Sequence, residues 1–187
     1  MVYTNYLFEY IGEVVSQLEK IRINGIKNDL SFSIDCSTLL DCTSSDLRKT
    51  VEYKPIFDLL KTVNGPVLYW FEITSTTDRK AIIAALNAYN NEVSARATPA
   101  LRSSINFDSN VLYVGKVKKA FSNRLLQHLG YFSVAATQGL QLLHWTQNSS
   151  LSLKVNLIEF EDDIADFMPV IEYAFAKKLH PLIGKHK

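Results

Sequence analysis

The sequence predicts one mixed α/β domain, in which a small sheet of about three strands is covered by helices, together with an N-terminal extension. The chain has 187 residues, of which 47% are hydrophobic and 21% are charged, so it can bury a core of ordinary size. From residue 65 onward, strand-like segments alternate with segments of helical periodicity. Elements in that order form a sheet with helices packed on it, as an α/β or α+β fold.

Three segments after residue 64 have the composition of strands. Residues 66–73, Pro-Val-Leu-Tyr-Trp-Phe-Glu-Ile, are rich in aromatic and branched side chains. Residues 111–117 form a second apolar run, and residues 151–160 alternate between apolar and polar side chains. An earlier alternation, over residues 30–35, predicts a short strand in the extension.

Apolar residues that recur every three or four positions predict helices in the rest of the chain. Thr77-Asp78 caps one whose apolar face extends to Val93, inside an insertion at residues 74–109 between the first two strands. The final helix begins near Pro169, which suits a first helical turn, and it stops at His180-Pro181. The other predicted helices cover residues 4–22, 55–61, 120–129 and 137–145.

Residues 1–64 form the extension, which is expected to be mainly helical and either to pack on the core of residues 65–187 or to stand apart from it. Its first helix carries apolar residues in a four–three spacing. They are Leu7, Ile11, Val14, Leu18 and Ile21. A helix with this spacing can pair with a partner helix, so a homodimer through this helix is one expectation.

Composition excludes several classes of protein. No apolar run approaches the ~20 residues that cross a bilayer, and Met1 opens neither a signal nor a transit peptide, so we expect a cytoplasmic protein with no membrane partner. Cys36 and Cys42 have no metal-binding or disulfide spacing. The net charge is only +1, but residues 111–187 hold nine Lys and Arg against six Asp and Glu, which favours a polyanion locally.

The segment from residue 110 to residue 128 concentrates side chains that can bind phosphate. Its basic residues are Lys116, Lys118, Lys119 and Arg124, and it has no Asp or Glu after position 110. Arg124 and His128 are four residues apart, so both lie on one face of the predicted helix. Two interpretations stay open at this point: a phosphate-binding site, or an ordinary strand-turn-helix whose basic side chains are solvated.

The order of residue types in residues 65–187 resembles that of the GIY-YIG nuclease family. Val67-Leu68-Tyr69 stands where the GIY triplet would be, and Tyr113-Val114-Gly115 stands where YIG would be. Arg124 follows nine residues after that glycine in the next helix, as the family arginine does, and His128 occupies a position where the family often has histidine. Glu172 matches the glutamate of the final helix.

The sequence departs from the family pattern in two places. The first triplet has no glycine, although Gly65 lies just upstream. The asparagine that usually follows the last helix is absent, and residues 181–185, Pro-Leu-Ile-Gly-Lys, stand there instead. The contact that the family makes through this asparagine therefore has no counterpart in the sequence.

The resemblance implies a divalent-metal-dependent endonuclease that hydrolyses DNA phosphodiester bonds. The implied catalytic residues are Tyr69, Tyr113, Lys116, Arg124, His128 and Glu172. Tyr69 would be the general base, Arg124 would stabilise charge on the phosphate, and Glu172 would hold Mg²⁺ or Mn²⁺, a hard cation that prefers oxygen ligands. The implied contacts with nucleic acid are Gly115, Lys118, Lys119 and Lys185.

Two other functions fit the same sequence. The missing asparagine and the modest net charge fit a nucleic-acid-binding module that has lost turnover, and the four–three spacing fits a protein-interaction domain. An acidic run also needs an interpretation. It comprises Glu159, Glu161, Asp162 and Asp163. We interpret it as the end of a strand and the start of a helix, where acidic residues are favoured, with a metal site as the alternative.

Overall fold

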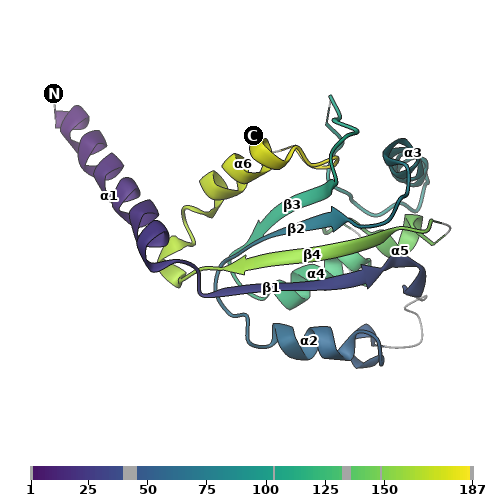
Figure 1. The fold of residues 1–187 in the computed structure, drawn as a ribbon. Helices are drawn as coiled ribbons and strands as arrows, with labels where there is room; N and C mark the ends of the chain where they lie inside the picture. The colour runs from purple at the N-terminus through teal and green to yellow at the C-terminus, as the bar shows by residue number, and fades with distance from the viewer. Residues whose placement is uncertain (1, 40–45, 103, 132–135, 148, 186–187) are drawn as a thin grey trace.

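The computed structural model describes residues 2–39, 46–102, 104–131, 136–147 and 149–185, and Cys42 lies outside these ranges (Figure 1). Its centre is a four-stranded antiparallel sheet with the strand order β1-β4-β2-β3. The strands are β1 (Asn28–Asp35), β2 (Val67–Ile73), β3 (Val111–Val117) and β4 (Ser152–Glu159). The three strands predicted after residue 64 are therefore confirmed.

The expectation of about three strands is too low by one, because the short strand of the extension joins the same sheet. Strand β1 pairs with β4 along its whole length, from Asn28 opposite Glu159 to Asp35 opposite Ser152. Alternation explains the pairing: Ile34 is buried in the core, while Ser31 and Ser33 are exposed. Residues 28–35 of the N-terminal extension are thus a strand of the central sheet.

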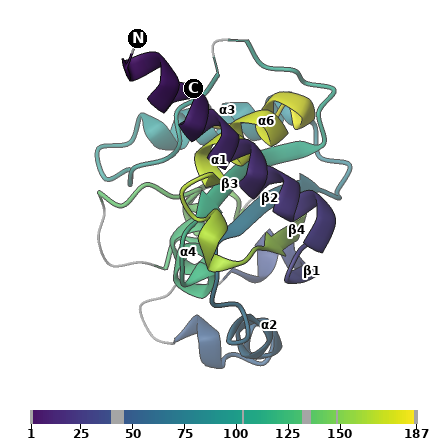
Figure 2. The same ribbon diagram turned by 90° about the vertical axis from the view of Figure 1, so that its left-hand side faces the viewer.

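In the described part of the chain, six α-helices accompany the sheet. They are α1 (Val2–Asn24), α2 (Lys54–Leu60), α3 (Arg79–Asn90), α4 (Phe121–Leu129), α5 (Leu142–Trp145) and α6 (Met168–Leu179). Single 3-10 turns span Cys36–Thr38, Leu47–Lys49 and Asp162–Ile164. Helices α2 and α4 lie on one face of the sheet, and α6 lies on the opposite face (Figures 1 and 2).

The two faces of β2 belong to two apolar clusters. Tyr69 and Phe71 point into the cluster shared with α2, α3 and α4, whereas Leu68 and Trp70 point into the cluster shared with α6. A strand that is apolar on both faces must be covered on both, because its side chains alternate between them. The continuous apolar run of residues 66–73 is explained by this sandwiched position.

Two predicted helices are shorter than expected. Helix α3 begins after Asp78, whose carboxylate accepts a hydrogen bond from the Lys80 amide, and it ends at Asn90, so Val93 is exposed beyond it. Only residues 142–145 of the expected 137–145 helix are helical. A side chain at Gly139 would collide with the backbone of Gln127, and Gln141 has a left-handed φ of 55°, so the chain before α5 follows a tight, non-helical path.

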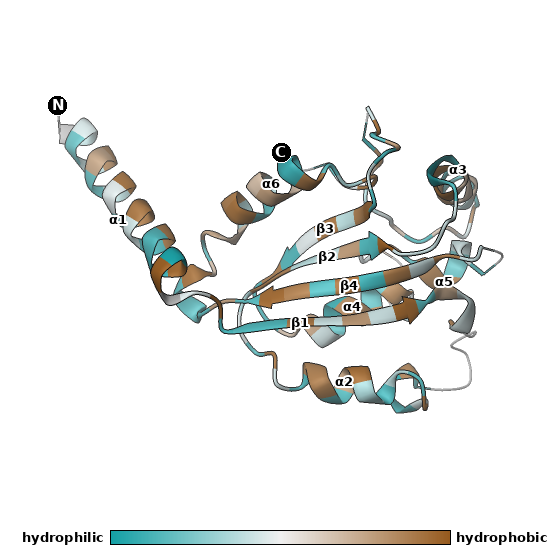
Figure 3. Cartoon of the chain, viewed as in Figure 1, coloured by the Kyte–Doolittle hydropathy of each residue, from teal (hydrophilic) through white to brown (hydrophobic). Residues whose placement is uncertain are grey.

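Helix α1 projects away from the rest of the molecule (Figures 1 and 2). It meets the body at its C-terminal end, where Ile21 packs against the α6 cluster and Lys20 lies 3.5 Å from a carboxylate oxygen of Asp163. Figure 3 shows apolar and polar residues alternating along its length. No helix among the described residues combines the length and the apolar character that a membrane crossing requires.

The acidic run contains a structural carboxylate. Glu159, at the end of β4, is completely buried, and its Oε1 accepts hydrogen bonds from the amides of Asn64 (2.8 Å) and Gly65 (2.6 Å). The Asn28 side chain also donates to it, and Lys27 Nζ lies 3.4 Å away. Glu159 thereby joins the start of β1 and the turn before β2 to the end of β4. Among the described residues, no group of three or more metal-binding side chains is present.

Replacing Glu159 by Ala is expected to lower the free energy of unfolding by about 3 kcal/mol, because it leaves buried amide donors without an acceptor. Burial raises the pKa of Glu159, but the hydrogen bonds from Asn28, Gly65 and Asn64 outweigh it and hold the pKa below its usual value of 4.5. This stabilisation is therefore present above pH 4.5 and is lost as the pH falls through the lowered pKa. Urea unfolding at pH 7 and at a series of pH values falling below 4.5 measures both effects.

The matched control for this prediction is Glu161→Ala, which removes an exposed carboxylate two residues away. We expect it to change stability by less than ~0.5 kcal/mol. Equal losses in the two variants would contradict a structural role for Glu159.

Candidate active site

A cleft of about 370 Å³ lies beside β3, the outer strand of the sheet. Its chemically active lining residues are Tyr113, Lys116, Gln138, Glu172, Tyr173 and Lys185. Three of these, Tyr113, Lys116 and Glu172, are among the six catalytic residues predicted from the sequence. The cleft is therefore where the predicted site has to be sought.

The position of β3 explains why residues from both faces of the sheet meet in this cleft. The C-terminal segment covers the start of the strand, since the amides of Leu182 and Ile183 donate to the carbonyls of Val111 and Leu112 at 2.9 and 3.0 Å. The cleft begins at the next residue, Tyr113. Alternation along the strand points Tyr113 to the α4 face, and the Lys116 side chain meets Glu172 of α6 on the other face.

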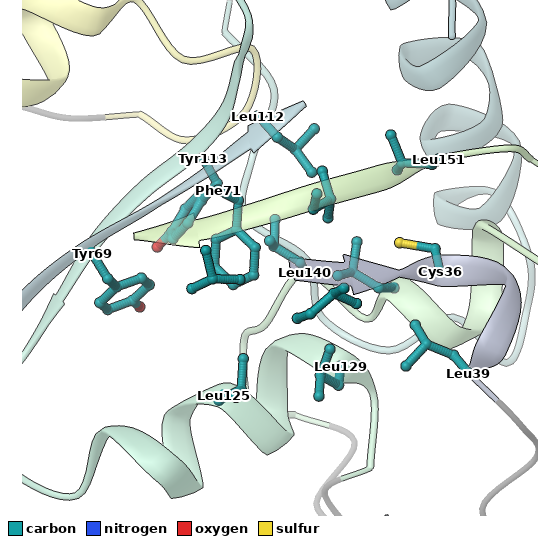
Figure 4. Close-up of a cluster of buried hydrophobic side chains, with 14 of the residues drawn as sticks. Cys36, Leu39, Tyr69, Phe71, Leu112, Tyr113, Leu125, Leu129, Leu140 and Leu151 are labelled. Atoms are coloured by element: carbon teal, nitrogen blue, oxygen red, sulfur yellow. The ribbon is translucent and has the colours of Figure 1, made fainter. Parts of the chain in front are cut away.

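Two tyrosines lie side by side on the α4 face, over a glycine. Tyr69 of β2 is directly opposite Gly115 of β3, and Tyr113 precedes that glycine by two residues on the same face. A Cβ atom at Gly115 would lie 2.6 Å from the Tyr69 hydroxyl and 2.7 Å from the Tyr113 ring. Figure 4 shows both rings at one end of the buried cluster, opposite the end formed by Cys36 and Leu39. Gly115 thus makes room for the tyrosine pair.

Helix α4 presents two donors to the Tyr69 hydroxyl. Arg124 Nε lies 3.0 Å from this oxygen, and His128 Nε2 lies 2.8 Å from it. The Leu140 amide donates to His128 Nδ1 at 3.1 Å, so Nδ1 is the unprotonated nitrogen of the neutral ring and Nε2 carries the hydrogen. Because Arg124 and His128 are one helical turn apart, the expected placement of both on one face is confirmed.

Burial is the largest influence on the pKa values of Tyr69, Tyr113 and His128. It raises the pKa of Tyr69 far above its ordinary value of 10, with a further increase from nearby Tyr113 that the Arg124 charge opposes. Burial also raises the pKa of Tyr113, again against the lowering effect of Arg124. Burial and the Arg124 charge together keep the pKa of His128 well below its usual value, so His128 is neutral at pH 7.

The two tyrosines differ in their access to the cleft. Tyr113 lines it and is 8% exposed, whereas Tyr69 has no exposed surface and lies behind it. Tyr69 was the residue expected to act as general base. Its burial places it one layer away from any bound molecule, with the hydroxyl held by Arg124 and His128.

Arg124 connects the tyrosine pair to the rim of the cleft. Its Nη1 donates to the side chain of Gln127 at 2.8 Å and to the carbonyl of Gln138, a cleft residue, at 2.6 Å. The guanidinium is half-buried and is held from two sides, by α4 and by the segment before α5. A fork of donors fixed in this way suits recognition of a phosphate group.

Glu172 forms an ion pair with Lys116, with 2.7 Å between Nζ and Oε2. Its side chain is 16% exposed at the cleft wall. A single carboxylate beside a phosphate site is a sufficient protein ligand for Mg²⁺, which keeps several of its waters. The residues present therefore fit one hydrated divalent cation at Glu172. This cation would compete with Lys116 for the carboxylate.

The predicted contacts with nucleic acid have different surroundings. Lys185 is exposed and lines the cleft, and Lys119 is exposed at the end of the β3–α4 turn. Lys118 is exposed and paired with Asp166 at 2.7 Å. Gly115 is buried under the tyrosines, so the expected contact of this residue with nucleic acid is replaced by a role in packing.

Sequence reasoning missed two residues of the cleft. Gln138 lies in a segment that was predicted to be helical, and its position depends on the turn around Gly139. Tyr173 follows Glu172 on α6 and is 44% exposed. Its location next to the predicted glutamate in the sequence was a signal that it would share the cleft.

Comparisons with protein-family models, curated proteins and solved structures found no match to the chain.

Proposed function

We propose that the protein is a divalent-metal-dependent endonuclease that hydrolyses DNA phosphodiester bonds at the β3 cleft, with a GIY-YIG-like arrangement of its residues. The observation that carries the proposal is the convergence of Tyr113, Lys116 and Glu172 on one cleft, with Arg124 directly behind it. These residues come from one strand, β3, and two helices, α4 and α6. Their order along the chain suggested a common site before any contact was known.

The chain's own residues have distinct parts in this proposal. The Arg124 guanidinium, held behind the cleft by its contact with Gln138, supplies positive charge that stabilises the charge developing on the phosphate oxygens in the transition state. Lys185 and Lys119 attract the flanking backbone of the nucleic acid. Glu172 would hold Mg²⁺ or Mn²⁺, which supplies a polarised water and a positive charge at the phosphate.

We assign the contact with the attacking water to Tyr113, in place of Tyr69, because Tyr113 is the tyrosine that lines the cleft. Tyr69 acts behind it as a positioning residue. His128 and Arg124 both donate to the Tyr69 hydroxyl, so the pair of rings is fixed in one orientation. The position of Lys116 next to Glu172 makes it the cation that neutralises this carboxylate before metal binds.

The test of the proposal is cleavage of supercoiled plasmid, duplex and branched DNA with Mg²⁺ or Mn²⁺, against EDTA. We expect nicking or linearisation that requires the metal and falls by about 10²–10³-fold in Arg124→Ala. The matched control is Arg48→Ala, which removes an exposed arginine outside the cleft lining. Intact DNA in every metal-containing reaction, with all three substrates, would contradict an endonuclease.

The two tyrosines are distinguished by the pH dependence of cleavage. Because the pKa of Tyr113 is raised above its usual value of 10, its basic form becomes more abundant throughout the range from pH 6 to 9. We expect the cleavage rate to rise by about tenfold per pH unit in the unchanged protein and to lose both rate and slope in Tyr113→Phe. Tyr69→Phe should retain the slope. If Tyr69→Phe loses more of the pH dependence of the cleavage rate than Tyr113→Phe does, Tyr69 is the general base.

One observation favours a second function, a nucleic-acid-binding module without turnover. Glu172 is ion-paired and Tyr69 is buried, so the groups expected to carry catalysis are both satisfied within the protein. This function predicts salt-sensitive binding of the same DNA substrates with no metal-dependent product. The cleavage assay and a binding titration at two salt concentrations separate the two functions.

A further inference from the structure

The exposed face of helix α1 is the largest concentration of exposed apolar side chains in the described part of the chain. Nine large hydrophobic residues of α1 are exposed, with exposed fractions from 36% at Leu18 to 89% at Tyr3. Each of the other described elements exposes at most two. Surfaces of this kind in folded proteins usually bind a partner.

Helix α1 also lacks the support that a helix normally obtains within its own chain. It extends beyond the body over most of its length, and among the described residues no atom outside the neighbouring backbone of the helix lies within 4 Å of the Cβ position at Gly12, near its middle. A helix in water without tertiary packing is only marginally stable, and an interior glycine costs it roughly 0.5–1 kcal/mol more. A partner that covers the apolar face would supply the missing stabilisation.

We infer that α1 pairs with α1 of a second copy of this chain, in an antiparallel arrangement. Leu7, Ile11, Val14 and Leu18 form the seam, since their four–three spacing places them on one stripe of the helix, whereas Ile21, the next residue of that stripe, packs on the body of its own chain. In an antiparallel pair, Leu7 packs against Leu18 of the second copy, and Ile11 packs against its Val14. The interface is isologous, because the same surface is used on both copies.

The seam offers a contiguous apolar area to a second copy. Two exposed aromatic residues, Tyr3 and Tyr10, flank the stripe that contains Leu7, Ile11 and Leu18, whereas side chains two positions apart, such as Tyr6 and Phe8, point to different sides of the helix. Aromatic side chains bury roughly 150–250 Å² each, so Tyr3 and Tyr10 can contribute roughly 300 Å² per copy, to which the three aliphatic side chains add.

Charge disfavours a lipid surface, and the position of the body at one end of α1 favours the antiparallel direction. The helix has three acidic residues and only two basic ones, Lys20 and Arg22, which form ion pairs with Asp163 and Glu19 within the chain. Membrane-surface helices have a basic polar face, which α1 lacks. Antiparallel pairing keeps the two bodies at opposite ends of a helix about 34 Å long, and it opposes the two helix dipoles.

Sedimentation equilibrium at 10–100 µM tests the dimer with the full chain. We expect twice the mass of the chain for the unchanged protein, and a twofold fall in mass for the double variant Leu7→Glu/Ile11→Glu. The matched control is Asn5→Glu/Ser16→Glu, which adds the same charge at exposed positions off the seam and should remain dimeric. A monomer at 100 µM for the unchanged protein, or a dimeric Leu7→Glu/Ile11→Glu variant, would overturn the inference.

Cysteine cross-linking tests the direction without relying on a charged substitution. Leu7→Cys protein mixed with Leu18→Cys protein should form a disulfide-linked dimer under mild oxidation, in excess of the background of the unchanged chain. Leu7→Cys alone should not, because its two copies are separated by eleven helical residues, about 16 Å, in the antiparallel pair. Efficient self-linking of Leu7→Cys would overturn the antiparallel arrangement. If the protein is monomeric and sediments together with phosphatidylglycerol vesicles, the partner of α1 is a membrane, and the dimer is overturned.

Discussion

Replacing Glu172 by Gln is expected to reduce metal-dependent cleavage by about 10³-fold or more while the fold is retained. The substitution keeps the shape of the side chain and removes the charge that holds a divalent cation beside the phosphate. The side chain of its partner Lys116 is 32% exposed, so the loss of the Glu172 charge leaves no deeply buried cation without a partner. The rate of plasmid nicking at saturating Mn²⁺ measures the effect on catalysis.

Metal binding gives this prediction a readout besides activity. Free Mn²⁺ measured by electron paramagnetic resonance should fall on addition of the unchanged protein with DNA in excess, and should fall less with Glu172→Gln. Asp166→Asn is a matched control, because Asp166 forms a lysine ion pair of the same 2.7 Å length with Lys118 outside the cleft lining. Full activity and unchanged Mn²⁺ binding in Glu172→Gln would show that Glu172 does not hold the metal.

The second large effect is expected from Gly115→Ala. One added methyl group would lie 2.6 Å from both Cζ and the hydroxyl of Tyr69, and 2.7 Å from the Tyr113 ring. Both rings are buried, so they cannot move aside without opening the core between β2, β3 and α4. We expect a loss of about 1–3 kcal/mol in the free energy of unfolding, together with the loss of cleavage. Urea unfolding and the plasmid assay measure the two consequences.

Gly12→Ala is the matched control, since it adds the same methyl group where no atom lies within 4 Å of the new carbon. Alanine at this exposed helical position should leave cleavage unchanged and should favour α1 by roughly 0.5–1 kcal/mol. The signs are opposite because the added methyl group collides with the tyrosines at Gly115, whereas at Gly12 it only favours the helical backbone. A Gly115→Ala protein that kept both its stability and its activity would show that the tyrosine pair is not held over this glycine.

The amino-acid sequence determined the local structure wherever hydrophobic periodicity was strong. The strand at residues 111–117 and the helix from residue 121 to residue 129 occur where the pattern predicts them, because alternation and helical spacing decide which side chains can be buried together. Sequence spacing also predicted that Arg124 and His128 share a helix face. The ordered residues Tyr69, Tyr113, Arg124 and Glu172 were identified as a set before their contacts were known.

Tertiary structure decided which of those residues reach the cleft. Burial of Tyr69 and exposure of Tyr113 depend on how α4 packs over the sheet and on where the C-terminal segment stops covering β3. Tertiary structure also decided the fourth strand. Residues 28–35 alternate in the sequence, but only pairing with β4 makes them part of the central sheet. Periodicity records which side of an element is apolar, whereas neighbours distant in sequence determine what covers that side. For α1, the described part of the chain supplies such neighbours only at the C-terminal end, near Ile21, and we propose that a second copy covers the rest of its apolar face.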